Sequence, residues 1–261
     1  IKGGAGSAGT SWSILPGELV DDSTYSVTLT VRDQYGQAAS VVRTFTTDFV
    51  PPAIPILDAT FDPATGSTAL VGDAGEDAGE PTVALSLWRV EGESRTLVAD
   101  DLPQGTTIID PTPRLGAGVV YELVAQAASG ATASATAAVD TTVEGTFFFN
   151  FGPGLSEFAV LDINVSIGQT PRRSKAVYHF AGRSRPSVFY GERRTRDLSI
   201  SGDLFDDPAS EAAFSALGHA ASDIIYRTPR GERHRVTAEV DLSEGVGPRI
   251  TRVDVRMSEV G

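Results

Sequence analysis

The sequence predicts a multidomain, mostly β protein that ends in an α+β domain with one short helix. Three observations lead to this fold class. Apolar and polar residues alternate with a period of two over many short runs, Gly, Pro and Asp separate these runs, and a capped helical signal occurs near residue 207. With 261 residues, 27 Gly and 15 Pro, the chain suits two or three modest domains, each with its own core.

The first predicted element is a β-hairpin between residues 25 and 47. One face of its first strand is apolar and the other carries hydroxyl groups. The apolar positions are Tyr25, Val27, Leu29 and Val31. A turn signal follows at residues 33–36, and the β-branched run at residues 41–47 suits a returning strand. Residues 1–49 therefore fit the C-terminal half of a sandwich domain, and we expect these residues to be a portion of a longer polypeptide.

A similar ending recurs about ninety residues later, which implies two domains of one kind. A strand pattern at residues 119–127, which contains Tyr121, is followed by a turn and a small-residue strand at residues 131–139. A Leu and a Gly precede Tyr121, as they precede Tyr25. This arrangement resembles the tyrosine corner of fibronectin type III and immunoglobulin-like sandwiches, in which the phenol bonds to backbone a few residues upstream.

Five further strand patterns lie between the two tyrosines. They occupy residues 54–61, 67–71, 83–90, 96–99 and 106–109. The resemblance therefore implies a complete fibronectin type III-like domain at residues 50–142, preceded by half of another at residues 1–49.

Residues 143–261 differ because a helix occurs among the strands. Asp207 is a predicted N-cap, Pro208 takes the first helical position, and Gly218 follows the last apolar residue. Strand patterns surround this helix at residues 198–204, 233–242 and 250–257. We expect an α+β domain, a sandwich or curled sheet with one helix across it.

Short motifs occur in a fixed order in this C-terminal region. They are FFFNFG (147–152), VSIG (165–168), AVYHFAGRSRP (176–186), SGDL (201–204) and YRTPRGER (226–233). Together they resemble the C-terminal domain of minor tail proteins from long-tailed bacteriophages of actinobacteria. The resemblance implies a virion structural protein of the tail tip or baseplate, extracellular after release, that assembles symmetrically and positions the host-contact apparatus. It carries over no catalytic residues.

Charge is distributed unevenly along the chain. Residues 1–142 carry 6 Lys and Arg against 18 Asp and Glu, whereas residues 143–261 carry 15 against 16. The net charge of −13 repels phosphate backbones, so we expect no specific nucleic acid partner. The absence of cysteine excludes disulfides, thiolate nucleophiles and cysteine-ligated zinc. No apolar run approaches the ~20 residues of a membrane span.

The titratable residues predict no enzyme, cofactor or metal site. His179, His219 and His234 lie in no HxH or HExxH spacing. Adjacent carboxylates, as at Asp206 and Asp207, point to opposite faces of an extended chain and suit turns and caps. The acidic, glycine-rich segment at residues 72–80 is the best calcium-loop candidate, but it lacks the Asp-x-Asp-x-Asp-Gly order and fits a solvated hairpin tip.

An adhesin or carbohydrate-binding module, within a cell-surface or secreted multimodular protein, is the alternative function. Its aromatic platforms would be Trp12 and Trp88, the latter offset from the apolar face of its strand, and its ligand a host cell-surface polysaccharide. A sandwich Trp more often packs in the core or under a loop. The aromatic run at residues 147–151 is too continuous for a one-sided strand, so both of its faces are expected to meet protein.

Residues 176–202 hold the strongest functional signal, because arginines lie there beside aromatic residues, a composition enriched at protein interfaces. The candidate interface residues are Arg183, Arg185, Phe189, Tyr190, Arg193, Arg194 and Arg196. Guanidinium groups pair bidentately with carboxylates, so the expected partners are acidic surfaces on other copies of the chain or on other tail proteins. A soluble strand with charged outer residues is the competing interpretation.

Overall fold

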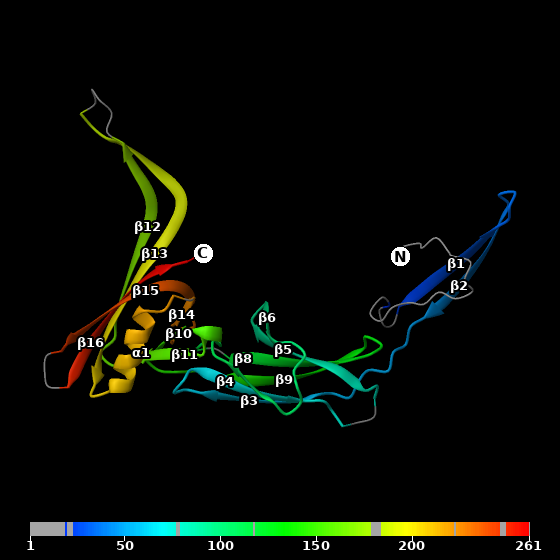
Figure 1. Ribbon diagram of the computed structural model, residues 1–261, viewed down its shortest axis with the longest axis horizontal. Coiled ribbons are helices and arrows are strands. Elements are labelled where there is room, and N and C mark those ends of the chain that lie inside the picture. The colour runs from blue at the N-terminus through cyan, green and yellow to red at the C-terminus, as the bar shows by residue number, and fades with distance from the viewer. Residues whose placement is uncertain are drawn as a thin grey trace.

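The computed structural model describes residue 19 and residues 23–76, 79–116, 118–178, 184–221, 223–245 and 249–260, and for residues 171–176 and 187–195 it describes the backbone alone (Figure 1). Within these residues the fold is mostly β, with antiparallel sheets and a single α-helix. The predicted β-rich fold class is therefore confirmed. The identity of the domains as fibronectin-like stays a prediction.

The predicted N-terminal hairpin is present as β1 (Thr24–Arg32) and β2 (Ala38–Thr46). The carboxylate of Asp33 accepts hydrogen bonds from the backbone N–H groups of Tyr35 and Gln37 and so closes the turn. Tyr25 pairs with Phe45, and their rings stack with centroids 5.7 Å apart. No further described strand joins this sheet, and its apolar side chains are exposed, Leu29 by 64%.

Residues 56–140 form two sheets packed around one core. The first contains β3 (Ile56–Asp62), β4 (Ser67–Asp73) and β7 (Thr107–Asp110). The second has the order β6 (Ser94–Ala99), β5 (Thr82–Glu91), β8 (Gly118–Ala127), β9 (Thr132–Asp140). All five strand patterns predicted between residues 54 and 109 form strands, because their alternating apolar residues fill this core. The core residues are Leu70, Leu85, Leu87, Leu102, Val119, Tyr121, Leu123, Ala125 and Val139.

The C-terminal domain is built on one seven-stranded sheet. Its order is β11 (Glu157–Leu161), β10 (Phe147–Phe151), β14 (Ile224–Arg227), β15 (Arg233–Glu244), β16 (Ile250–Glu259), β13 (Ser187–Phe205) and β12 (Ser166–Tyr178). A short 3₁₀ helix at Pro153–Leu155 links β10 to β11. Every neighbouring pair in this sheet is antiparallel.

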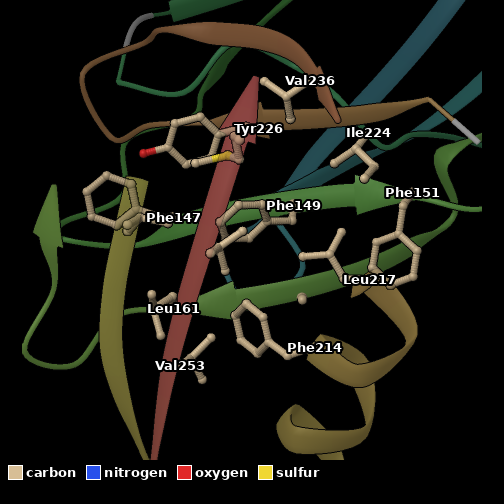
Figure 2. Close-up of a cluster of buried hydrophobic side chains, with 14 of the residues drawn as sticks. Phe147, Phe149, Phe151, Leu161, Phe214, Leu217, Ile224, Tyr226, Val236 and Val253 are labelled. Carbon is tan, nitrogen blue, oxygen red and sulfur yellow. The ribbon is translucent and has the colours of Figure 1, made fainter. Parts of the chain in front are cut away.

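The helix α1 (Pro208–Gly218) lies against this sheet as predicted. The Asp207 carboxylate caps it by accepting hydrogen bonds from the N–H groups of Ala209 and Ser210. Figure 2 shows Phe214 and Leu217 of α1 among the aromatic residues of β10 and β14. The ring of Phe149 meets that of Phe214 edge to face at 5.8 Å and stacks on that of Tyr226 at 5.2 Å.

Strand β10 is buried along its whole length. Phe147, Phe149 and Phe151 belong to the core under α1, whereas the ring of Phe148 lies against Gly66 and Arg227 at the sandwich. The prediction that both faces of this aromatic run meet protein is confirmed. One face meets the core of its own domain and the other meets the neighbouring domain.

Candidate assembly surfaces: an arm and a joint

Strands β12 and β13, at one edge of the seven-stranded sheet, extend beyond its other strands. They pair with each other from Ser166 opposite Ser201 to Tyr178 opposite Ser187, but β16 pairs with β13 only over residues 197–205. Residues 171–178 and 187–196 therefore form a two-stranded ribbon beyond the edge of the sheet, and Figure 1 shows it leaving the body of the molecule. We call the segment from residue 171 to residue 196 the arm; the structure does not describe its residues 179–183.

The charge of the arm is opposite to that of the rest of the chain. Residues 171–196 contain eight Lys and Arg and a single Glu, whereas the remaining residues contain 13 Lys and Arg against 33 Asp and Glu. Seven net positive charges are thus concentrated on one projecting element of an acidic protein. Such an element creates a local potential that attracts carboxylate-rich surfaces.

The structure brings six of the seven candidate interface residues onto the arm's described part. Phe189, Tyr190, Arg193 and Arg194 lie in β13, where Tyr190 is opposite Lys175 and Arg194 is opposite Arg173. Arg185 lies just before this strand and Arg196 lies on it; both are exposed. Arg183 lies outside the described residues. Apolar side chains are also exposed here, such as Tyr178 by 53%.

A second arginine cluster, which the sequence analysis did not predict, connects the sandwich to the C-terminal domain. At its centre Arg227 is fully buried. Its Nε and Nη2 donate to Asn150 Oδ1 at 3.1 and 2.7 Å, and its Nη1 donates to the carbonyl oxygens of Gly66 at 2.6 Å and Pro113 at 3.1 Å. One side chain of the C-terminal domain thus binds two loops of the sandwich. We call this contact the joint.

The guanidinium of Arg227 is buried, and none of the four hydrogen bonds just described goes to a carboxylate. Burial lowers the pKa of Arg227 to about 9, and the negative charge of nearby Asp110 opposes this shift. The group stays charged at neutral pH, so its hydrogen bonds are charge-assisted. The guanidinium carbon also lies 5.1 Å from the centroid of the Phe148 ring, in cation–π range.

Two further arginines cross the joint in opposite directions. Arg114 of the sandwich donates from Nε to the carbonyl of Gly231 at 2.8 Å. Arg233 of the C-terminal domain donates to the carbonyl of Thr112 at 3.0 Å and forms an ion pair with Glu91 at 3.1 Å. The turn at residues 226–233, one of the motifs in the sequence, therefore fits against the loop at residues 110–116.

Glu91 links the joint to a buried polar network inside the sandwich. Its carboxylate lies 3.3 Å from Nε of Arg89, whose Nη1 donates to both oxygens of Asp110 at 2.8 and 2.7 Å. Tyr121 donates its hydroxyl to the same carboxylate at 2.9 Å. Ion pairs and hydrogen bonds thus run from the sandwich core to Arg233, which fixes the side chains that hold the joint.

The geometry of Tyr121 corrects one expectation from the sequence. In a tyrosine corner the phenol bonds to backbone, whereas here it bonds to the side chain of Asp110, eleven residues upstream. Burial raises the pKa of Tyr121 above its ordinary value of 10, and the charge of Asp110 raises it further. Arg89 draws Asp110 into this position, because a buried carboxylate needs a cationic partner.

Two glycines allow the domains to approach closely. A Cβ at Gly66 would lie 2.9 Å from the Phe148 ring, and one at Gly116 would lie 2.3 Å from the carbonyl oxygen of Pro229. Both residues also have positive φ, 64° and 69°, which L side chains rarely adopt. The joint therefore requires glycine at both positions.

The described histidines have local partners. His219 follows α1, with Nδ1 2.7 Å from the carbonyl oxygen of Ser215, and His234 Nδ1 lies 3.1 Å from Glu259 Oε1. His179 lies outside the described residues. Within the described part of the chain, no three His, Asp or Glu side chains are grouped in a way that could hold a metal ion.

The aromatic platform of the alternative function is partly covered. The guanidinium carbon of Arg95 lies 4.1 Å from the centroid of the Trp88 ring, and Trp88 is half-buried. Trp12 lies outside the described residues. In the acidic segment at residues 72–80, Glu80 accepts a hydrogen bond from Ser129, and residues 77 and 78 are not described.

Among the described residues, none of the helices is long and apolar enough to cross a membrane. Comparison with models of known protein families and with curated proteins finds no match for this chain.

Proposed function

We propose that this chain is a virion structural protein of a phage tail, a minor tail, tail-tip or baseplate component that assembles through its arm. The observation that carries the proposal is the arm itself, a basic two-stranded ribbon that projects from an acidic body. An isolated two-stranded ribbon is marginally stable in water. A projecting ribbon of this kind gains stability when it packs on a partner, so its folding favours association.

The joint supports the same proposal. A component that positions a host-contact apparatus has to hold its domains at a fixed angle, and three arginines cross from one domain to the other here. The C-terminal domain, whose motif order resembles that of minor tail proteins, contains both the arm and the turn that supplies Arg227 and Arg233 to the joint. In this proposal the sandwich is a spacer, and the C-terminal domain joins it to neighbouring subunits.

Self-association of the full chain tests the assembling role. The full chain is needed because removal of the sandwich would expose Arg227 and remove its acceptors at Gly66 and Pro113. Light scattering should show a discrete oligomer at low salt, and either high salt or the double variant Arg193→Glu/Arg194→Glu should dissociate it. The matched control Arg230→Glu/Arg256→Glu changes the same charge at exposed positions outside the arm and should leave the oligomer intact. A monomer under all conditions would contradict self-assembly.

Location tests the tail assignment separately. Antibodies against this chain, used for immunogold labelling of long-tailed phage particles that encode it, should label the end of the tail. Labelling of the head, or none on intact particles, would refute a tail component.

A further inference from the structure

The outer face of the β3–β4–β7 sheet is acidic and apolar at once. Successive side chains of a strand point to opposite faces, and in these three strands every second residue points into the core. The residues between them point outward and are exposed or half-exposed. These are Ile56, Asp58, Thr60, Asp62, Ser67, Ala69, Val71, Asp73, Thr107 and Ile109. The three strands contain no Lys or Arg. We call this surface the acidic face.

The strand register places three carboxylates around an apolar centre. Asp58 is opposite Val71, Asp62 is opposite Ser67, and Asp73 is opposite Ile56. Ala69 of β4 is opposite Ile109 of β7. Ile56 and Ile109 are 54% and 53% exposed, so apolar surface lies beside these carboxylates. A partner for this face needs cations at its margin and apolar groups at its centre.

The arm has that composition. Beside its eight Lys and Arg it carries apolar and aromatic residues, among them Val177, Tyr178, Phe189 and Tyr190. We propose that the arm of one copy lies on the acidic face of a second copy. This inference rests on the proposed assembly function and adds the surface that receives the arm.

The contact is between molecules because the two surfaces lie apart within one chain. In Figure 1 the arm leaves the C-terminal domain in a direction away from β3 and β4. The joint fixes this arrangement. The arm therefore reaches an acidic face only on another copy.

Local charge dominates over the repulsion between two acidic chains. The Debye length is about 8 Å at physiological salt, so separated surface charges are screened while groups in contact still attract. Each copy offers one arm and one face, which is a heterologous contact. Such contacts produce a closed ring or an open filament, depending on the rotation between neighbours.

Charge reversal on both surfaces gives the first test. Asp58→Lys/Asp73→Lys on the face and Arg193→Glu/Arg194→Glu on the arm should each weaken association of the full chain at least tenfold. The chain that carries all four substitutions should recover association, because the charges are exchanged rather than lost. Glu239→Lys/Glu244→Lys is the matched control, with two exposed carboxylates of the C-terminal domain reversed, and should associate like the wild type. Circular dichroism and thermal melting confirm that each variant is folded.

Cross-linking gives the second test, because the chain contains only two lysines, Lys2 and Lys175. A carbodiimide should join Lys175 of the arm to Asp58, Asp62 or Asp73. An equal mixture of ¹⁴N- and ¹⁵N-labelled chains should give mixed-isotope linked peptides, which identifies the link as intermolecular.

The outcomes separate this inference from the proposed function. If the arm variant dissociates the oligomer but the face variant does not, and Lys175 links to carboxylates elsewhere, the acidic face is not the receiving surface although the arm still assembles the protein. A wild-type chain that stays monomeric overturns both.

Discussion

At the scale of single residues, Arg227 has the most consequential position in the molecule. Its guanidinium donates four hydrogen bonds, to one amide oxygen of its own domain and to two backbone carbonyls of the sandwich. Arginine is the amino acid suited to this position, because its planar guanidinium spreads its donors over three nitrogens, whereas lysine has a single nitrogen and cannot reach three separated acceptors at once.

Replacement of Arg227 should therefore destabilise the protein strongly. We expect Arg227→Ala to lower the free energy of unfolding by about 3 kcal/mol or more, because buried acceptors lose their donors. Arg227→Lys should have an intermediate effect. Guanidinium chloride denaturation measures this change. Arg230→Ala, an exposed arginine in the same turn, is the control and should change stability little; equal effects of the two alanine substitutions would show that the joint contributes little.

The N-cap of α1 gives a prediction for acidic pH. Hydrogen bonds from the side chain and backbone of Ser210, and from the backbone of Ala209, hold the pKa of Asp207 below its ordinary value of 3.8. The stability that ionised Asp207 contributes is therefore present above that ordinary pKa and is lost as the pH falls through the lower, folded-state pKa.

Asp207→Asn should cap the helix without this pH dependence. At pH 7 it should be slightly less stable than the wild type, and Asp207→Ala should be less stable by about 1 kcal/mol. The difference between wild type and Asp207→Asn should shrink as urea denaturation is repeated from pH 7 down to pH 2.5. A constant difference over this range would exclude ionised Asp207 as the source.

Residue types predicted some of these roles and not others. The Asp-Pro pair at residues 207–208 identified the cap, because a cap is a local interaction between neighbours in sequence. The burial of Arg227 had no local signal. It depends on Gly66 and Pro113, which are distant in the sequence, and an arginine in a turn is ordinarily exposed.

At the scale of elements, β12 and β13 differ from the other strands. Sequence alternation located the inner part of β13 at residues 198–204, where one side packs on the core, but not residues 187–196, which have no core to face. Strands of the arm therefore show no clean period of two. The sandwich strands were predictable for the opposite reason, because each buries one face.

Trypsin should cleave first in the two isolated two-stranded ribbons, the arm and the hairpin of β1 and β2. When the chain is monomeric we expect early cleavage at the Lys and Arg residues of residues 171–196 and at Arg32 and Arg43, because local opening of a two-stranded ribbon breaks few contacts. Under conditions of assembly the sites in the arm should become protected, whereas Arg32 and Arg43 should stay accessible. Mass spectrometry of a timed digest measures both rates. The buried arginines, Arg89 inside the sandwich and Arg227 at the joint, should resist cleavage throughout, and initial cleavage at either would contradict their burial.

At the scale of the whole molecule, the joint makes the sandwich and the C-terminal domain one unit. Charged hydrogen bonds cross it in both directions, and glycines at both contact points bring the backbones together. Two domains of one chain ordinarily move relative to each other, and these contacts oppose such motion.

Gly66→Ala should separate the two domains. Its methyl group would collide with the Phe148 ring, so we expect a larger radius of gyration in X-ray scattering and two calorimetric transitions in place of one. Gly92→Ala is the matched control, because Gly92 also has positive φ, 62°, but has no neighbour within 4 Å. Both variants carry the same backbone strain, and only Gly66→Ala should change the scattering. Identical scattering would show that the domains are not held by this contact.

The direction of β3 determines how the sandwich responds to a pulling force. The turn that follows β3 touches the joint, so the strand begins at the end far from the C-terminal domain, next to the proline-rich segment at residues 51–55. Tension between the hairpin and the C-terminal domain then acts along β3. Ladder hydrogen bonds lie perpendicular to a strand, so this tension loads the bonds between β3 and β4 together in shear rather than one after another. The sandwich should therefore resist force best along the axis that joins the hairpin to the C-terminal domain.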